Sequence, residues 1–267
     1  MKINFSKMHG LGNDYVVIDA IHKKINLTPT IIQKLCNRNF GVGADGVVLV
    51  LPATKSVKAD LRMRIFNSDG SEAEMCGNGT RCLAKFAYEH RLARSKNFLV
   101  ETLSGVKPIT LYIKHNKVSE IKVEMGIPRG INNFEIRITN LLFPATNVSM
   151  GNPHCVIFVK DTDKFPVEKY GPLIEHDHRF IKGTNVEFVQ LVNKNIIKQR
   201  TWERGVGETF ACGTGASASV VAGVFNKLTS RNVTVLLKGG KLHIEYTTAG
   251  MVYLKGTAEE VFSGTIF

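Results

Sequence analysis

The chain has 267 residues, 43% of them hydrophobic, which is enough for one large domain or for two ordinary domains with their own cores. Charged residues make up 22%, close to the average, which argues against wholesale disorder. The net charge of +12 comes from scattered lysines and arginines. Such a distribution fits a solvated basic surface or an anionic small substrate better than nucleic acid.

The start of the chain, MKINFSKMHG, lacks the apolar core of a signal peptide, and no apolar run approaches the length that crosses a bilayer. The cysteines are odd in number and widely spaced, which favours cytosolic thiols over a disulfide framework. They are Cys36, Cys76, Cys82, Cys155 and Cys212. We therefore expect a cytoplasmic protein that does not bind membranes.

The first half of the chain predicts two helices among several strands. Residues 28–38 begin with Thr28 and Pro29, which is typical of a helix N-terminus. A second helix is predicted over residues 80–89, because their apolar side chains share one face. The predicted strands are residues 3–7, 15–20, 47–51, 61–67, 98–101, 109–114 and 121–125.

The second half predicts a similar series of elements. One strand ends near Met150, a short helix covers residues 167–174, and a longer helix covers residues 216–225. The remaining predicted strands are residues 185–192, 196–202, 233–237, 241–246 and 251–255.

One glycine-rich segment, GVGADG at residues 41–46, matches the spacing of a dinucleotide-binding loop. The strand-like run VVLV follows it where such a loop would open a helix, so the dinucleotide interpretation fails. The cysteines and histidines show no paired spacing suited to zinc. We therefore expect neither a metal nor a cofactor.

One segment of the sequence occurs twice. Residues 66–79 align without gaps on residues 202–215, and both contain an aromatic strand end, a polar turn and a Cys-Gly-x-Gly sequence before a helix. In this alignment Glu72 falls on Glu208 and Cys76 falls on Cys212. The repeat predicts two similar lobes that face one cleft, with the two cysteines opposite each other.

Each repeated cysteine stands at the start of a predicted helix, where the first N–H groups have no partner within the helix. An anion binds at such an end, and a thiol there has its pKa lowered from about 8.5 toward neutrality. Two such ends can hold one carboxylate, while one thiolate removes an α-proton and the other thiol returns a proton to the opposite face. Cys76 and Cys212 therefore indicate a racemase or epimerase, whereas the other three cysteines are expected to be buried and inert.

Several motifs in order resemble the diaminopimelate epimerase family. They are KMHGLGND (7–14), FNSDGS (66–71), CGNGTR (76–81), MGNPHC (150–155), TN (184–185), ERGVGET (203–209) and ACGTG (211–215). The resemblance implies interconversion of LL- and meso-2,6-diaminoheptanedioate without pyridoxal phosphate, in lysine and peptidoglycan-precursor synthesis.

The resemblance also implies a homodimer and an α/β (α+β) fold with two pseudo-symmetric lobes. Each lobe would be a mixed β-sheet or barrel wrapped around a central helix, with the active site in the cleft between the lobes. We place the N-terminal lobe at residues 1–120, completed by residues 259–267, and the C-terminal lobe at residues 121–258.

The resemblance assigns roles at the reacting end of the substrate. Cys76 and Cys212 would be the acid–base pair, supported by His154 and by Glu203, which would meet an ammonium or tune a thiol. Asn13 would help to position the reacting end. The N–H groups that would hold the reacting carboxylate belong to Gly77, Asn78, Gly213 and Thr214.

Polar residues that resemble the family's distal-end contacts are Asn67, Asn152, Asn185 and Arg204. Arg204 would fork onto the distal carboxylate. One position departs from the family pattern: some members have Gln where this chain has Gly46, and that Gln contacts substrate. Gly46 has no side chain for this contact, so the backbone or a neighbour would have to replace it.

Three alternatives stay open on the residues alone. A proline-racemase-like or other two-thiol racemase would use the same chemistry, although Arg204 and three asparagines suit a second charged amino-acid end that proline lacks. A binding protein or isomerase-like relative with the same fold would have two inert thiols. A basic nucleic-acid binder would show salt-sensitive binding to DNA or RNA.

Overall fold

The protein, seen here in a computed structural model that describes residues 2–266, divides into two compact units. Unit 1 comprises Met1–Val123 and Gly256–Phe267, and unit 2 comprises Glu124–Lys255. Within residues 2–266, each unit combines a mixed sheet with two helices, which confirms the predicted α/β class. The lobe boundaries predicted from the sequence, residues 1–120 with 259–267 and residues 121–258, stay a prediction.

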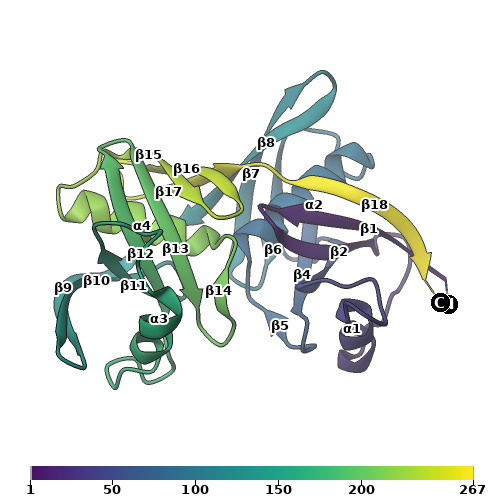
Figure 1. The fold of residues 1–267 in the computed structure, drawn as a ribbon. Helices are drawn as coiled ribbons and strands as arrows, with labels where there is room; N and C mark the ends of the chain where they lie inside the picture. Colours follow the sequence, from purple (N-terminus) through teal and green to yellow (C-terminus); the bar gives the residue numbers. More distant parts are fainter. Residues whose placement is uncertain (1, 267) are drawn as a thin grey trace. The chain divides into compact units, whose positions relative to one another are not determined.

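Unit 1 is a mixed sheet around helix α2 (Figure 1). The strands are ordered β18–β1–β2–β3–β4–β6–β7–β8, and the short β5 pairs with β4. The β2–β3 and β4–β6 pairs are parallel and the other pairs are antiparallel. The elements are β1 Ile3–Gly10, β2 Asn13–Asp19, α1 Pro29–Cys36, β3 Gly46–Pro52, β4 Leu61–Asn67, β5 Glu72–Ala73, α2 Gly77–Glu89, β6 Asn97–Thr102, β7 Gly105–Lys114, β8 Lys117–Gly126 and β18 Glu259–Ile266.

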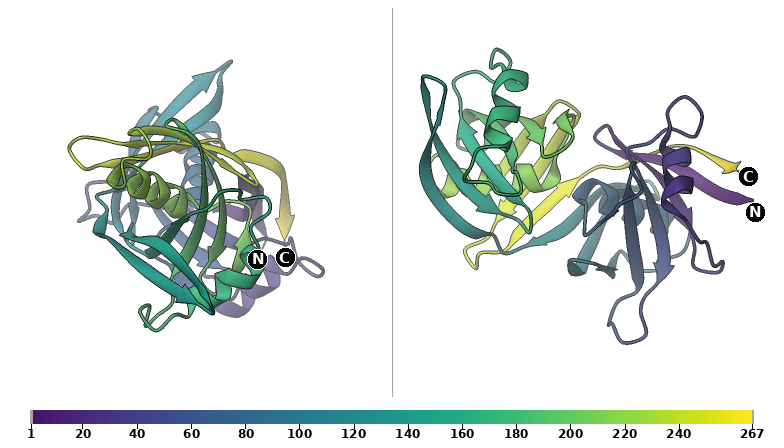
Figure 2. Two further views of the ribbon diagram at one scale, coloured as in Figure 1. Left: turned by 60° about the vertical axis from the view of Figure 1, so that its left-hand side comes forward. Right: turned by 90° about the horizontal axis from the view of Figure 1, so that it is seen from below.

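Local sequence explains the central elements of unit 1. In β3 the run Val47–Val50 is completely buried, because β2 and β4 flank the strand and apolar residues cover both of its faces. Helix α1 begins where Thr28 caps the Ile31 N–H and Pro29 occupies the first turn, as predicted. Strand β18 pairs with β1, so the first and last strands of the chain lie side by side (Figure 2).

Unit 2 repeats this topology around helix α4 (Figure 1). Its strands are ordered β9–β10–β11–β12–β13–β15–β16–β17, with parallel β11–β12 and β13–β15 pairs, and β14 pairs with β13. The elements are β9 Arg129–Ile138, β10 Leu141–Ser149, β11 Pro153–Phe158, α3 Val167–Glu175, β12 Asn185–Asn193, β13 Ile196–Glu203, β14 Gly207–Thr209, α4 Gly213–Phe225, β15 Asn232–Leu237, β16 Gly240–Tyr246 and β17 Val252–Gly256.

The two repeated helices are equivalent in length and in how they begin. Helices α2 and α4 have 13 residues each, and Cys76 and Cys212 are their N-caps. Both helices start at the glycine after the cysteine, at Gly77 and Gly213, earlier than the predicted starts at residues 80 and 216. The Cys-Gly-x-Gly sequence therefore forms the cap and first turn, which confirms that both cysteines stand at helix starts. Among residues 2–266, no helix is long and apolar enough to cross a membrane.

Candidate active site

The Cys76 half-site lies in unit 1, where β2 meets the start of α2. The Cys76 Sγ atom lies 3.0 Å from the Tyr15 hydroxyl and 3.9 Å from Asn13 Oδ1. Asn78, in the first turn of α2, donates from its side-chain amide to Asn13 Oδ1 over 3.2 Å. The fold thus brings together three of the predicted residues, Asn13, Cys76 and Asn78.

The turn before β3 fixes the orientation of Asn13. Asn13 Nδ2 donates to Asp45 Oδ2 over 2.8 Å, and the Tyr15 hydroxyl donates to Asn13 Oδ1 over 2.5 Å. The amide therefore presents its oxygen to the cysteine side. Neither Asp45 nor Tyr15 was predicted. Their sequence signals were the GVGADG turn, which contains Asp45, and the KMHGLGND motif, which Tyr15 follows directly.

A buried arginine holds the first turn of α2. The fully buried Arg81 donates to Asn78 Oδ1 over 2.9 Å, to the Gly77 carbonyl over 3.2 Å and to the Thr257 carbonyl over 3.0 Å. Burial lowers the pKa of the Arg81 guanidinium. Gly10 packs against it so closely that an added Cβ would lie 2.9 Å from Arg81 Nη2. Arg81 therefore ties the helix start to β1 and to the segment before β18.

Gly46 and Asn67 lie beside Tyr15 on neighbouring strands, since Tyr15 pairs with Gly46 and Gly46 pairs with Asn67. A Cβ at Gly46 would lie 2.3 Å from the Phe66 carbonyl oxygen and 3.2 Å from Tyr15 Cε1, so this backbone leaves no space for a side chain. Asn67 is exposed, and its amide donates to Ser71 Oγ over 2.9 Å. The substitute for the missing Gln contact stays a prediction.

The Cys212 half-site lies in unit 2, at the start of α4. The Cys212 Sγ atom accepts from the Gly215 N–H over 3.3 Å and lies 3.4 Å from Thr214 Oγ1. Asn152 donates from its side-chain amide to the same Thr214 hydroxyl over 3.3 Å. Three predicted residues, Asn152, Cys212 and Thr214, are therefore joined in one chain of contacts.

A completely buried pair of side chains supports this chain of contacts. His154 Nδ1 lies 2.9 Å from Glu187 Oε1, and both side chains are 0% exposed. His154 Nε2 lies 3.0 Å from Asn152 Oδ1. An added Cβ at Gly215 would lie 2.5 Å from Glu187 Oε1, so the carboxylate fits closely beneath the first turn of α4. Glu187 was not predicted; its signal was one acidic residue within the strand-like run NVEFVQLV.

In unit 2, the residues predicted to bind the distal end of the substrate make different contacts. Asn185 Oδ1 accepts from the Arg204 N–H over 3.1 Å, and Asn185 Nδ2 donates to the Pro153 carbonyl over 2.9 Å. Arg204 is exposed, and its guanidinium donates to the Lys182 carbonyl over 3.3 Å. Glu203 Oε1 accepts from Thr209 Oγ1 over 2.6 Å. Asn185 therefore orders the backbone from which Arg204 projects.

The environment of Cys212 opposes the lowered pKa that its helix start predicts. Burial raises the pKa of the Cys212 thiol, and the nearby Glu203 and Glu187 carboxylates raise it further. Hydrogen bonds from Thr214 and Gly215 act in the opposite direction but are outweighed. The expectation of a lowered pKa is therefore contradicted for Cys212, because desolvation and two nearby carboxylates disfavour the thiolate.

This environment gives a test at the thiol itself. Glu203→Gln removes one negative charge that disfavours the thiolate, so the pH midpoint for alkylation of Cys212 should fall. Iodoacetamide labelling, quantified on the Cys212 peptide by mass spectrometry from neutral to alkaline pH, measures the midpoint. An unchanged or higher midpoint contradicts a charge effect of Glu203.

The remaining cysteines are buried, as predicted. Burial raises the pKa of the Cys36 thiol to about 11 and that of the Cys82 thiol to about 12, and it also raises the pKa of Cys155. Within residues 2–266, no group of three or more histidine, cysteine, aspartate or glutamate side chains is arranged to hold a metal ion.

Equivalent arginine–glutamate pairs brace the turns before the two cysteines. Arg64 and Glu72 form two hydrogen bonds of 2.8 Å, and Arg200 and Glu208 form two of 2.6 and 2.9 Å. Lys238 also lies 2.9 Å from Glu208. These pairs occupy equivalent positions of the repeat, so Glu208 has the same bracing role in unit 2 that Glu72 has in unit 1.

The Glu208 pair predicts a pH-dependent contribution to stability. Burial alone would raise the pKa of the Glu208 carboxyl, but Arg200 and Lys238 outweigh burial and lower it below the ordinary 4.5. The contribution is therefore present above pH 4.5 and is lost as the pH falls. Glu208→Gln should lower Tm by about 2 °C at neutral pH, and the difference from the parent should shrink in acid. Calorimetry across this range measures it, and a constant difference contradicts the assignment.

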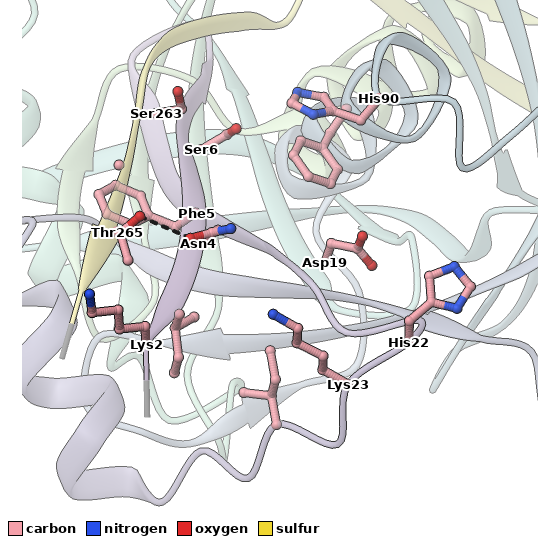
Figure 3. Close-up of a pocket in the computed structure, with 14 residues that line it drawn as sticks. Lys2, Asn4, Phe5, Ser6, Asp19, His22, Lys23, His90, Ser263 and Thr265 are labelled. Atoms are coloured by element: carbon pink, nitrogen blue, oxygen red, sulfur yellow. Dashed lines mark hydrogen bonds between the residues drawn. The ribbon is translucent and has the colours of Figure 1, made fainter.

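A separate cavity of about 570 Å³ lies in unit 1 along β1 and β18 (Figure 3). Its lining includes Lys2, Asp19, His22, Lys23 and His90, and none of the predicted site residues. The polar contacts of the cysteines, rather than this cavity, define the candidate active site.

Solved structures share the fold of the chain. A PhzF-family phenazine biosynthesis protein from Bacillus anthracis is 19% identical, with a TM-score of 0.75, and the match covers 100% of this chain and 99% of that chain. A hydroxyproline epimerase from Agrobacterium vitis with bound trans-4-hydroxy-L-proline is 15% identical, with a TM-score of 0.73, over 99% and 92% of the two chains. The architecture is thus one that an amino-acid epimerase also has.

Closer similarity comes from sequence. The family model for diaminopimelate epimerase matches residues 5–131 and 146–261. A diaminopimelate epimerase from Pelotomaculum thermopropionicum is 49% identical, with 98% of each chain covered. One from Leptospira biflexa is 47% identical, with 100% of this chain and 99% of that protein covered. The chain belongs to the diaminopimelate epimerase family.

Proposed function

We propose that the protein interconverts LL- and meso-2,6-diaminoheptanedioate by a two-base reaction that needs no pyridoxal phosphate. Family membership supports the reaction. The observation that carries the catalytic assignment is the equivalence of the half-sites: Cys76 and Cys212 are both N-caps of buried 13-residue helices. The protein is therefore an isomerase in which Cys76 and Cys212 act on opposite faces of one α-carbon.

In this mechanism one cysteine is a thiolate and the other is a thiol. The thiolate takes the α-proton, and the electron pair of the broken C–H bond delocalises into the adjacent carboxylate. The N–H groups in the first turns of α2 and α4 stabilise that charge, and they belong to Gly77, Asn78, Gly213 and Thr214. The opposite thiol then donates its proton to the other face of the carbon.

In one direction of the reaction Cys212 is the thiol that donates its proton to the carbanion, and in the other direction it is the base. His154 and Glu203 support this end of the site, and Asn13 positions the reacting end of the substrate beside Cys76. The distal amino-acid end would be bound by Asn67, Asn152, Asn185 and Arg204. The exposed guanidinium of Arg204 has two parallel N–H donors, which match the two oxygens of a carboxylate.

The decisive experiment uses purified, reduced enzyme and LL-diaminopimelate in D₂O. The expected result is meso product with deuterium at the inverted α-carbon, while the LL isomer recovered early contains little deuterium. Proline and 4-hydroxyproline in the same assay should show neither inversion nor exchange. Folded protein that leaves LL-diaminopimelate unchanged, or that prefers proline, overturns the proposal.

The wider biological assignment is part of the same proposal. The substrate is a small diamino dicarboxylate, and the family resemblance supports a cytoplasmic homodimer that acts in lysine and peptidoglycan-precursor synthesis without nucleic acid or membrane partners. Light scattering of the purified protein measures the oligomeric state.

A further inference from the structure

The two half-sites are equivalent beyond the repeated segment itself. In unit 1, Tyr15 stands two residues after Asn13 and pairs across parallel strands with Gly46. In unit 2, His154 stands two residues after Asn152 and pairs in the same way with Asn185. Tyr15 therefore occupies in unit 1 the place that His154 occupies in unit 2.

The contacts follow the same pattern. The Tyr15 hydroxyl bonds to Asn13 Oδ1 over 2.5 Å, and His154 Nε2 lies 3.0 Å from Asn152 Oδ1. The two asparagines then contact the second residue of α2 and of α4, at 3.2 and 3.3 Å. The difference is that the Tyr15 hydroxyl also reaches the sulfur of Cys76, at 3.0 Å.

The geometry around the ring shows how the hydroxyl is aimed. A Cβ at Gly46 would lie 3.2 Å from Tyr15 Cε1, and a Cβ at Gly79 would lie 3.6 Å from Tyr15 Cζ. The ring thus lies against two glycines, and Tyr15 is only 5% exposed. A phenylalanine would keep these ring contacts and lose only the contacts of the oxygen.

Hydrogen-bond chemistry sets the direction of each bond. Asn13 Oδ1 can only accept, so with a neutral thiol the phenol hydrogen goes to Asn13. The Cys76 S–H then has two acceptors, the phenol oxygen at 3.0 Å and Asn13 Oδ1 at 3.9 Å, and the shorter distance favours the phenol oxygen. A thiolate can only accept, so the phenol hydrogen then turns to the sulfur. Asn13 Oδ1 keeps a donor in that state, because Asn78 Nδ2 also bonds to it.

We propose that Tyr15 is a positioning residue for Cys76, whose hydroxyl accepts from the thiol and donates to the thiolate, so that the sulfur keeps its place as its proton moves. This inference rests on the proposed role of Cys76 in proton transfer. Tyr15 is then the counterpart in unit 1 of His154, and it acts by direct contact with the Cys76 sulfur.

Other charged groups near this contact are held by hydrogen bonds and ion pairs that do not involve the Tyr15 hydroxyl. Arg81 interacts electrostatically with Cys76 and Tyr15, and it is held by Asn78 and two carbonyl groups. Asp45 is held by Asn13 and by Arg38, and Asp14 by Arg38 and Lys7. Tyr15→Phe therefore removes the hydroxyl's contacts with the Cys76 sulfur and with Asn13 Oδ1 and changes no charge, and Asn13 Oδ1 keeps the Asn78 amide as a donor.

The test compares Tyr15→Phe with the parent by alkylation of Cys76, followed on the Cys76 peptide. The rate at neutral pH should fall about tenfold, and the pH midpoint should rise by about one unit, the effect of one lost hydrogen bond to a charged acceptor. kcat/KM should fall by a similar factor in both directions, as the equilibrium between the isomers requires. Tyr112→Phe removes a hydroxyl from a residue that is 41% exposed in the same unit, and should match the parent.

An alkylation rate and midpoint equal to the parent's, in Tyr15→Phe protein of unchanged Tm, overturn the inference. If Tyr15→Phe does not fold, 3-fluorotyrosine at position 15 provides the test. Its hydroxyl is a stronger hydrogen-bond donor, so the pH midpoint for Cys76 alkylation should fall. An unchanged midpoint overturns the inference. The alkylation readout needs no turnover. A parent enzyme inactive on diaminopimelate but with Tyr15-dependent Cys76 alkylation would therefore contradict the proposed function alone.

Discussion

Cys76→Ala and Cys212→Ala enzymes are each expected to lose epimerisation by about 10²- to 10⁴-fold, because each variant lacks one of the two proton-transfer groups. Neither change should unfold the protein, since alanine keeps the helix starts and removes only a sulfur. Epimerisation rates in both directions, with circular dichroism as a check on folding, measure the effect. Inversion at the parental rate in either variant contradicts the two-base scheme.

Isotope exchange makes the same variants more informative. Each variant keeps one thiol, which still reaches the α-hydrogen on its own face. Cys212→Ala should therefore exchange that hydrogen for deuterium slowly in one isomer of diaminopimelate, and Cys76→Ala should do so in the other. Equal exchange of both isomers by one variant would indicate a single-base mechanism. The isomer preferred by each variant also identifies the base in each direction.

Cys36→Ala provides the matched control for these two variants. Cys36 is buried in the core of unit 1, and burial raises the pKa of its thiol to about 11. It carries no role in the proposed reaction, so its removal should leave the epimerisation rate unchanged. A large loss of activity in this variant would mean that the losses in the other two reflect packing rather than proton transfer.

Sequence alone placed both cysteines at helix starts, because a short repeated pattern controls them, although each helix begins three residues earlier than predicted. The Cys-Gly-x-Gly sequence supplies the cap and first turn in each unit, and the arginine–glutamate pairs that brace the preceding turns obey the same repeat. Strand β9 was not predicted. Its residues include Gly130 at φ +60° and two adjacent asparagines, and many are exposed, so the alternation that signals a strand is weak.

The contacts that support the two cysteines could not be predicted from the sequence, for a different physical reason. Asp45, Tyr15 and Glu187 contact partners that are 32, 61 and 33 residues away in the chain, and sequence spacing does not reveal which distant segments become neighbours. The pKa of Cys212 was misjudged for the same reason. A helix start is visible in the sequence, whereas burial and approaching carboxylates are properties of the assembled unit.

Replacing Glu187 should have the largest effect on stability. Glu187 and His154 are completely buried partners, so Glu187→Ala leaves the imidazole without its carboxylate and opens a cavity beneath α4. Breaking a buried pair costs about 3 kcal/mol or more, which corresponds to a fall in Tm of roughly 6 °C or more. Thermal unfolding followed by circular dichroism measures it, and a change below about 1 °C contradicts a structural role for the pair.

Glu187→Gln separates the charge of this residue from its shape. His154 Nε2 faces Asn152 Oδ1, which can only accept, so a neutral imidazole places its hydrogen there and leaves Nδ1 as an acceptor. The glutamine amide can donate to that nitrogen, so most of the stability should be retained. The negative charge that raises the pKa of Cys212 is lost, and the pH midpoint for its alkylation should fall.

The two substitutions together test how the buried pair affects the thiol. Within residues 2–266, Glu187 Oε2 is one of the few buried side-chain nitrogen or oxygen atoms without a hydrogen-bond partner. Burying this carboxylate therefore costs free energy, which its contact with His154 must offset. If the pair serves only packing, Ala and Gln should differ in Tm but leave Cys212 alkylation unchanged. If the carboxylate also keeps Cys212 protonated, Glu187→Gln should have nearly parental Tm and faster alkylation at neutral pH. The second pattern is expected, because the carboxylate lies against Gly215, whose N–H donates to the Cys212 sulfur.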